Sequence, residues 1–370
     1  MGYSLKLIYI MQLKKVLASA LILSASLCVC SAQTTSSQVI ENGGTGPFKS
    51  VAVGDAGLTT HVIYRPADLA AAARENGGKL PVILYANGAC VNNSLEMSRL
   101  LSEVASYGYV IMAIGPYEEY TDEKFYDQWR GVVRSAYPST KEVLVMGNGE
   151  RVFAYTEEEL AAQKVQREAA REAVMAEMKK ASKSKKKASA APAPFRTYPR
   201  QMLEALDWLT DQNATQGSEY YHLIDLEKVA AMGQSCGGAQ VLAVAHDPRI
   251  KTCVMLNTGI GENSMQGATK ASLENLHTPM FYMIGGPVDI AFKNAQGDYD
   301  NIKTLPIVMA NSLDGHSGTY YEKNGGPYAV AARKWLDWQL KGKVGESAMF
   351  LDDEYEAKFY PNWTFVRKNW

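Results

Sequence analysis

The sequence predicts an α/β fold with a mostly parallel central sheet and helices on both faces. Short apolar runs recur along the chain without alternating polar residues, and turn-forming residues close most of them. Such runs are typical of parallel strands that are covered on both faces. Between many of them lie stretches in which apolar residues recur at helical spacing. Strand and helix therefore alternate, as in a single α/β domain.

The expected elements follow from these runs and their turn signals. The expected strands are residues 61–64, 80–85, 109–114, 229–232, 251–256, 280–284 and 306–311. The expected helices are residues 93–107, 200–212, a helix that begins at Cys236, and 328–340. Glycine closes the first and last of these helices, at Gly108 and Gly342, as is common at helix ends. The Gly-rich stretch 34–46 is expected to be poorly ordered.

Composition places the chain among ordinary globular proteins. Its 370 residues are 46% apolar and 21% charged, with a formal net charge of −1. No global field therefore favours nucleic acid or an anionic membrane, and we expect no nucleic-acid partner. Beyond the N-terminal segment no apolar run reaches the ~20 residues that a spanning helix needs. Oligomeric state is not indicated.

The first residues resemble a secretory signal peptide. Lys14 and Lys15 precede the apolar run 16–29, and small residues follow up to Ala32. We expect residues 1–32 to be a signal peptide cleaved near Ala32, which leaves a secreted or periplasmic chain. A lipoprotein attached through Cys30 is the alternative.

The remaining chain divides around one insertion. Residues 33–120 and 196–370 are expected to be the two parts of the α/β domain, and residues 121–195 an insertion between them. Within it, a charged stretch at 157–180 precedes a segment rich in Lys, Ala and Pro that ends at residue 194. This composition predicts a solvated helix and a linker. A lid over an active site is the functional alternative.

A short motif follows the expected strand 229–232. It reads Gly233-Gln234-Ser235-Cys236-Gly237, and its glycines leave room for a sharp turn into the next helix. Such a turn lifts the Ser235 hydroxyl above the sheet edge and leaves the Cys236 N–H free to face an oxyanion. The pattern is that of a nucleophile elbow, so Ser235 is the candidate nucleophile.

A serine nucleophile needs a base, and the base needs an orienting acid. Catalytic groups in open α/β sheets gather beyond the carboxyl ends of the strands. Of the five histidines, only His316 follows such a strand end closely. Asp289, after strand 280–284, gives the expected order of serine, acid and histidine. The alternative acids are Asp298, Asp300 and Asp314.

The loop after strand 80–85 is expected to supply the second oxyanion donor. We expect the N–H of Ala89 to join that of Cys236, with Gly88 as the alternative. Cys90 and Cys236 both flank this position. A disulfide between them would tie the loop to the serine turn, but we expect ordinary buried thiols.

Candidate substrate-binding residues lie at the start of the insertion and beside the serine. They are Tyr117, Tyr120, Tyr126, Trp129 and Gln234. For the aromatic residues, simple packing is the alternative. The chain has no H-E-x-x-H motif and no clustered set of His and Cys ligands, so we expect no metal and no cofactor.

Ser235, Asp289 and His316, in this order, resemble the α/β-hydrolase superfamily. The likeness covers roughly residues 60–120 and 196–342. The two motifs YANGACVNNS and GQSCGG together resemble secreted bacterial serine esterases of the dienelactone hydrolase and cutinase-like polyester hydrolase group. Polyester hydrolases usually carry His before the serine and Met after it, where this chain has Gln234 and Cys236. Their oxyanion-loop aromatic residue is matched by Ala89. Dienelactone hydrolases use Cys at the position of Ser235.

The resemblance and the residues together predict a secreted serine hydrolase. It would cleave a carboxylic ester, small or polymer-linked, through an acyl-enzyme intermediate. One alternative is a serine peptidase of the same fold. Another is a non-catalytic surface or binding protein that retains the hydrolase fold.

Overall fold

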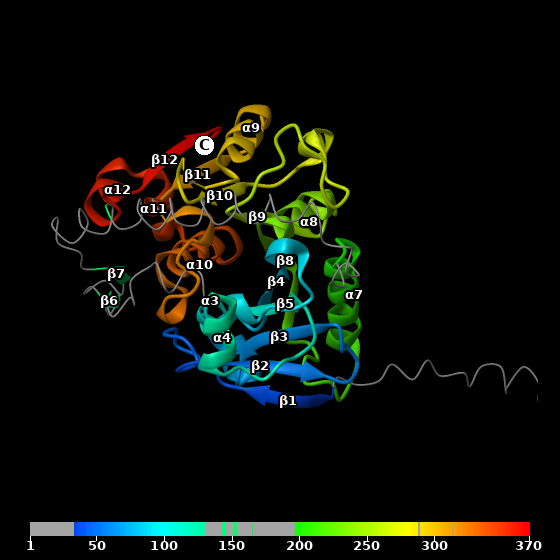
Figure 1. The fold of residues 1–370 in the computed structure, drawn as a ribbon. Helices are drawn as coiled ribbons and strands as arrows, with labels where there is room; N and C mark the ends of the chain where they lie inside the picture. Colours follow the sequence, from blue (N-terminus) through cyan, green and yellow to red (C-terminus); the bar gives the residue numbers. More distant parts are fainter. Residues whose placement is uncertain are drawn as a thin grey trace, which may run out of the picture.

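The computed structural model describes residues 33–129, 143–145, 151–153, 165, 197–287, 289–312 and 314–370. Helices cover both sides of one ten-stranded sheet in this part of the chain (Figure 1). The expected signal peptide lies outside the described residues, and so does most of the insertion 121–195. The helix expected at 157–180 falls outside them too, apart from Val165.

The elements have the following bounds. The strands of the main sheet are β1 (Thr34–Gln38), β2 (Ser50–Asp55), β3 (His61–Pro66), β4 (Leu80–Ala86), β5 (Val110–Ile114), β8 (Ile224–Gln234), β9 (Ile250–Leu256), β10 (Met280–Ile284), β11 (Ile307–Asn311) and β12 (Thr364–Lys368). The α-helices are α2 (Leu69–Glu75), α3 (Ser98–Ala105), α4 (Asp122–Gln128), α7 (Arg200–Ala214), α8 (Cys236–Val244), α9 (Phe292–Asn301), α10 (Gly326–Lys341), α11 (Ala348–Leu351) and α12 (Asp353–Phe359). Short 3-10 turns near the site are η1 (Gly88–Cys90), η2 (Leu95–Met97) and η5 (Gly315–Ser317). A separate antiparallel pair consists of β6 (Val143–Val145) and β7 (Arg151–Phe153).

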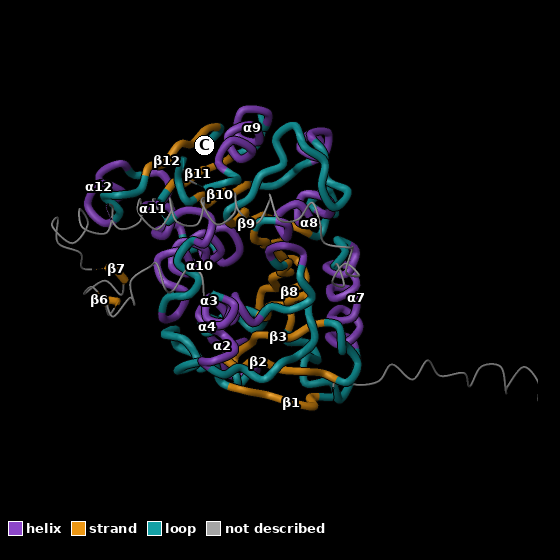
Figure 2. Tube along the Cα trace, viewed as in Figure 1, coloured by secondary structure: helices purple, strands orange, loops and turns teal. Residues whose placement is uncertain are grey.

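The main sheet is mixed and mostly parallel. Its strand order is β1-β2-β3-β5-β4-β8-β9-β10-β11-β12, seen in Figure 2 as a twisted band of strands. The run from β5 to β11 is parallel throughout. The strands β1, β2 and β3 at one edge, and β12 at the other, are antiparallel. The expected parallel centre is confirmed, and the antiparallel edges were not anticipated.

Two apolar layers explain why the central strands show no alternation. Along β4, Val82 and Leu84 pack into the layer that holds α7 and α8. Ile83 and Tyr85 pack into the opposite layer, with α3 and α10. Because both faces are covered, every residue of β4 is buried. Within the described ranges, no helix combines the length and the apolar composition that a membrane crossing requires.

One expectation about the N-terminal lead-in is wrong. The stretch 34–46 was expected to be poorly ordered, but β1 pairs antiparallel with β2. The loop that follows is also anchored, because the Thr45 N–H donates to a carboxylate oxygen of Glu103 at 2.8 Å. The open edge of β2 gives the backbone of this polar segment partners that its composition does not reveal.

The turn between β8 and α8 is packed too closely for side chains. A Cβ atom on Gly233 would lie 2.4 Å from the carbonyl oxygen of Gly237. A Cβ atom on Gly237 would lie 2.1 Å from the carbonyl oxygen of Ala86, at the end of β4. The expectation that these two glycines leave room for the turn is confirmed. Their positions bring α8 against the carboxyl end of β4.

We expect Gly237→Ala to lower the free energy of unfolding by about 1–3 kcal/mol, because the backbone of β4 must move to admit a methyl group. Gly345→Ala is the matched control, since nothing lies within 4 Å of its added Cβ atom, and it should change stability by less than about 0.5 kcal/mol. Urea denaturation of both variants measures the difference. Equal stability of the two variants would refute the close approach of α8 to β4.

Candidate active site

Ser235 lies at the turn between β8 and α8 in a strained backbone conformation. Its φ of 51° and ψ of −117° are unusual for a residue with a side chain. Three hydrogen bonds hold this conformation. The Ser235 N–H donates to the Leu256 carbonyl oxygen at 2.9 Å. The Ser235 carbonyl oxygen accepts from the Gly238 N–H at 2.9 Å and from Thr258 Oγ1 at 2.7 Å. Strain of this kind persists only where surrounding contacts enforce it, and it is common at functional sites.

The structure brings Ser235, His316 and Asp289 into one hydrogen-bonded series. His316 Nε2 lies 3.0 Å from Ser235 Oγ. His316 Nδ1 lies 2.7 Å from Asp289 Oδ1. The three residues come from the turn after β8, from η5 after β11, and from the loop after β10. They therefore meet at the carboxyl ends of three parallel strands, as the sequence predicts for such groups.

The Asp289 carboxylate is buried and fully engaged. Oδ1 also accepts from Ala291 N–H at 2.9 Å, and Oδ2 accepts from Asn257 Nδ2 at 2.7 Å and from Gly285 N–H at 3.0 Å. Burial by itself raises the pKa of Asp289, but the bond and charge of His316 and these other donors outweigh it, so that the pKa lies below its ordinary value. Because an ionised carboxylate only accepts, His316 Nδ1 must carry the proton and Nε2 is left to accept from Ser235.

Asn257 is a residue of the site that the sequence reasoning missed. Besides Asp289, its Nδ2 donates to the carbonyl oxygen of Gly315 at 2.9 Å, next to His316. Its Oδ1 accepts from the Tyr320 hydroxyl. Asn257 directly follows β9 and has a φ of 45°, a conformation that asparagine tolerates better than most residues. Its position directly after the expected strand 251–256 is the feature of the sequence that could have identified it.

The alternative acids and His61 lie in environments that differ from those of Asp289 and His316. Asp298 accepts from the N–H groups of Ile260 and Gly261 and from the Tyr282 hydroxyl, and its burial raises its pKa to about 6. Asp300 is exposed on α9, and Asp314 directly precedes η5, whereas the His316 ring is hydrogen-bonded to Asp289. Burial lowers the pKa of His61 to about 4, so this histidine is a neutral core residue.

Cys90 and Cys236 form a disulfide, and the expectation of ordinary buried thiols is wrong. Their Cα atoms lie 5.3 Å apart, within the range that a disulfide spans. Both cysteines sit where β4 and α8 approach each other, a contact that spans 146 residues of sequence and that spacing alone does not disclose. Cys253 is a free, buried thiol.

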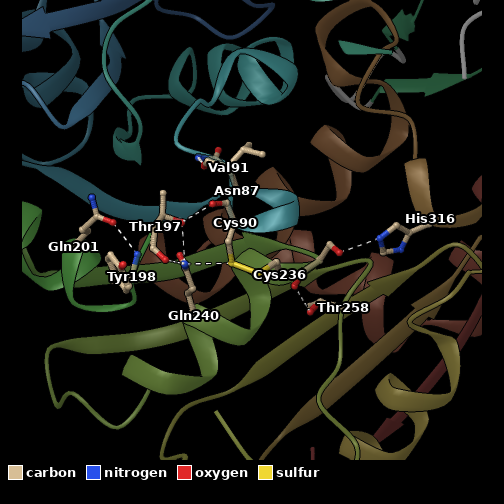
Figure 3. Close-up of a disulfide and its surroundings, with 11 residues drawn as sticks. Asn87, Cys90, Val91, Thr197, Tyr198, Gln201, Cys236, Gln240, Thr258 and His316 are labelled. Carbon is tan, nitrogen blue, oxygen red and sulfur yellow. Dashed lines mark hydrogen bonds between the residues drawn. A yellow bond between two sulfur atoms is a disulfide. The ribbon is translucent and has the colours of Figure 1, made fainter. Parts of the chain in front are cut away.

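The disulfide belongs to a polar network around the loop after β4 (Figure 3). Gln240 Nε2, on α8, donates to the carbonyl oxygen and the hydroxyl of Thr197, both at 2.9 Å, and lies 3.3 Å from Cys90 Sγ. Thr197 N–H donates to the Cys90 carbonyl at 3.2 Å. Asn87 Nδ2 donates to the carbonyl of Ile114 at 2.6 Å, which fixes the start of the loop.

The predicted oxyanion donors lie on the two segments that the disulfide joins. Ala89 and Cys90 have φ values of 49° and 52°, so this loop has an unusual, fixed backbone. Cys236 is the first residue of α8, and the first N–H groups of a helix have no partner inside it. Ala89 and Ser235 each precede one of the bonded cysteines, and Gly88 opens the same loop.

The predicted substrate-binding residues separate into two groups. Three tyrosines make contacts near the sheet edge: the ring of Tyr117 covers Gly54, and the hydroxyls of Tyr120 and Tyr126 accept from Arg99. In the described part of the chain no hydrogen bond or ring contact joins these tyrosines to Ser235 or His316. Their role in binding stays a prediction.

Gln234 contacts the segment of His316, and Trp129 contacts Glu96 and Tyr320. Gln234 Nε2 donates to the His316 carbonyl at 3.4 Å. Trp129 Nε1 donates to the Glu96 carbonyl at 3.1 Å, and its ring lies 6.1 Å from that of Tyr320. Glu96 itself was not anticipated. No pattern of the sequence marks it, because only the fold carries η2 back toward the serine turn.

Comparisons with known proteins point to the same class. The model of a family described as PET hydrolase-like matches residues 190–273, the segment that contains β8, Ser235 and α8. A protein named Hydrolase ffsE, from Aspergillus flavipes, is 41% identical over 54 residues, which are 15% of this chain and only 12% of that protein's length. These matches support an α/β-hydrolase similar to cutinase-like esterases, and the likeness is carried by the region around Ser235.

Proposed function

We propose that this protein is a serine hydrolase that cleaves carboxylic esters through an acyl-enzyme intermediate. The observation that carries the proposal is the hydrogen-bonded series from Ser235 Oγ through His316 to Asp289. The match over residues 190–273 supports the hydrolase class, as does the relative named a hydrolase. The substrate is a small or polymer-linked ester.

The proposed reaction has two steps. Ser235 Oγ bonds to the ester carbonyl carbon while His316 Nε2 takes the hydroxyl proton. The bond to the leaving oxygen then breaks, and His316 returns the proton to that oxygen. In the second step His316 activates a water molecule, which attacks the acyl-enzyme and releases the acid. Asp289 holds the ring in the tautomer that this exchange needs and stabilises the imidazolium.

The proposed oxyanion hole consists of the Ala89 and Cys236 N–H groups. The negative charge that develops on the carbonyl oxygen is best stabilised by donors already fixed in place. The disulfide, the Gln240 bonds and the strained backbone of the loop support such a fixed arrangement. The N-terminus of α8 adds its positive end.

Replacement of the proposed triad residues should remove turnover without unfolding the protein. Ser235→Ala should abolish labelling by a fluorophosphonate probe and hydrolysis of p-nitrophenyl acetate. Asp289→Asn should lower kcat by about 10⁴-fold, because the wrong tautomer of His316 is then favoured. Labelling, kcat and circular dichroism of each variant check these outcomes.

Asp300→Asn is the matched control, since Asp300 is an exposed carboxylate on the neighbouring α9. It should leave kcat near the wild-type value. A loss in Asp300→Asn as large as that in Asp289→Asn would reject the assignment of the acid. A Ser235→Ala variant that still hydrolyses the ester would reject the mechanism.

Reduction of the disulfide should lower kcat by about 10²-fold, because the Ala89 donor is then free to move away from the serine turn. The wild type is assayed before and after treatment with a phosphine reductant, with free thiols counted on the same samples. Cys90→Ala/Cys236→Ala should have the low kcat in both conditions, and should lose roughly 5 kcal/mol of stability for a closed loop of this length. Full activity of the reduced wild type would contradict this role.

Export of the mature chain is part of the proposal. The signal-like segment 1–32 supports it, and so does the Cys90–Cys236 disulfide, since disulfides persist mainly in oxidising compartments. Expression of the full chain in a bacterial host, followed by mass measurement of the exported fraction, should give a chain that begins at Gln33. A lipid-bearing Cys30 would support the lipoprotein alternative, and a cytoplasmic chain that retains residues 1–32 would contradict export.

A further inference from the structure

Glu96 places a carboxyl group without a partner beside the proposed oxyanion loop. Its Oε1 lies 3.4 Å from the point where a Cβ atom on Gly88 would stand. Its backbone carbonyl accepts from Trp129 Nε1, which fixes η2 against the aromatic residues around the site. Within the residues that the structure describes, the Glu96 carboxylate itself makes no hydrogen bond and no ion pair. Glu96 is only partly exposed.

The Glu96 carboxyl and the His316 ring interact through their charges. Burial raises the pKa of Glu96 to about 7, and the attraction of His316 opposes that rise. The same carboxylate contributes to the raised pKa values of Tyr85 and Tyr320, after burial as the main cause. The buried Tyr85 hydroxyl also has no partner in the described structure. The described structure therefore leaves a buried hydroxyl, that of Tyr85, and the partly exposed Glu96 carboxyl without a hydrogen-bond partner, and buried polar groups seldom lack one.

A second hydrogen-bond acceptor, the side-chain oxygen of Gln234, also lies beside Gly88. Gln234 Oε1 lies 1.9 Å from the same Cβ point of Gly88, while its Nε2 is turned to the His316 carbonyl. Two side-chain oxygens, one of them a carboxylate, thus converge on Gly88. Oxygen acceptors without donors are matched by a group that brings both N–H donors and positive charge.

Among the residues that the structure describes, the neighbouring elements do not supply that charge. Arg99, on α3, is taken up by ion pairs with Glu41 at 3.2 Å and Asp122 at 3.4 Å. The charged residues of α4 are exposed, and the groups of β4 and of the loop after η5 that face Glu96 are Tyr85 and Tyr320. The remaining facing group is His316, which is already bonded to Asp289 and Ser235.

We propose that Glu96 and the side-chain oxygen of Gln234 form a subsite for a positively charged ammonium group of the ester substrate. This inference rests on the proposed ester hydrolase function. The ammonium group would pair with the carboxylate that the protein leaves unpaired. Glu96 would then select the substrate, while Ser235 and His316 carry out the reaction.

A matched pair of esters tests the subsite. The probes are 2-(dimethylamino)ethyl thioacetate, whose amine keeps its proton near neutral pH, and 3-methylbutyl thioacetate, which has the same shape without the charge. We expect wild-type kcat/KM to favour the cationic ester by at least about tenfold at pH 8, the scale of a hydrogen bond to a charged group. The preference should fall toward unity near pH 6, because Glu96 is ionised above about pH 7 and neutral below it.

Two variants complete the test. Glu96→Gln keeps the shape of the side chain and should reduce the preference to near unity at every pH. Glu123→Gln removes a negative charge from an exposed position on the neighbouring α4 and should retain the wild-type preference. A pH-independent ratio in the wild type, or a preference that survives in Glu96→Gln, would overturn the subsite. Failure of the wild type to hydrolyse either ester would instead overturn the proposed function, and the wild-type pH series needs no variant to fold.

Discussion

The contact between the carboxyl end of β4 and the first turn of α8 determines the geometry of the whole site. Gly237 admits the Ala86 carbonyl oxygen where any side chain would collide. The same contact places Cys90 against Cys236 and allows the disulfide to close. Because the loop after β4 and the serine turn are both strained, they keep their conformations only while this contact holds them.

The second constraint is the charge of Asp289. Burial of a carboxylate costs free energy unless hydrogen-bond donors surround it. Here the donors are backbone N–H groups, Asn257 and His316. Asn257 also reaches Tyr320, and Trp129 packs on Tyr320 and fixes η2. A single polar and aromatic network therefore connects Asp289 to the segment that carries Glu96. The orientation of His316 and the position of η2 depend on the same residues.

The sequence predicts those parts of the site that depend on local patterns. Continuous apolar runs predict the parallel strands, and the glycine-flanked serine predicts the turn at Ser235, because both features are set by neighbours in the chain. Strand ends then restrict the choice of His316 and Asp289. Their catalytic roles, export and the function of the insertion stay predictions.

The features that the sequence did not predict arise from contacts between distant segments. The disulfide joins residues 146 positions apart. The strand β1 owes its order to the open edge of β2. Asn257 and Glu96 are ordinary polar residues in the sequence, and only the three-dimensional fold places them beside His316. Composition and residue spacing do not reveal which distant segments come into contact.

The residues around the serine also indicate which contacts can select a substrate. The cysteine that follows Ser235 is bonded to Cys90, so it presents no apolar side chain where the polyester hydrolases usually carry Met. Ala89 likewise offers only a methyl group in place of an aromatic ring. The side chains that remain beside Gly88 are those of Gln234 and Glu96, both polar. A large apolar side chain is therefore absent from these two positions, and the groups beside Gly88 offer charge and hydrogen bonding instead, which reject a mismatched group strongly.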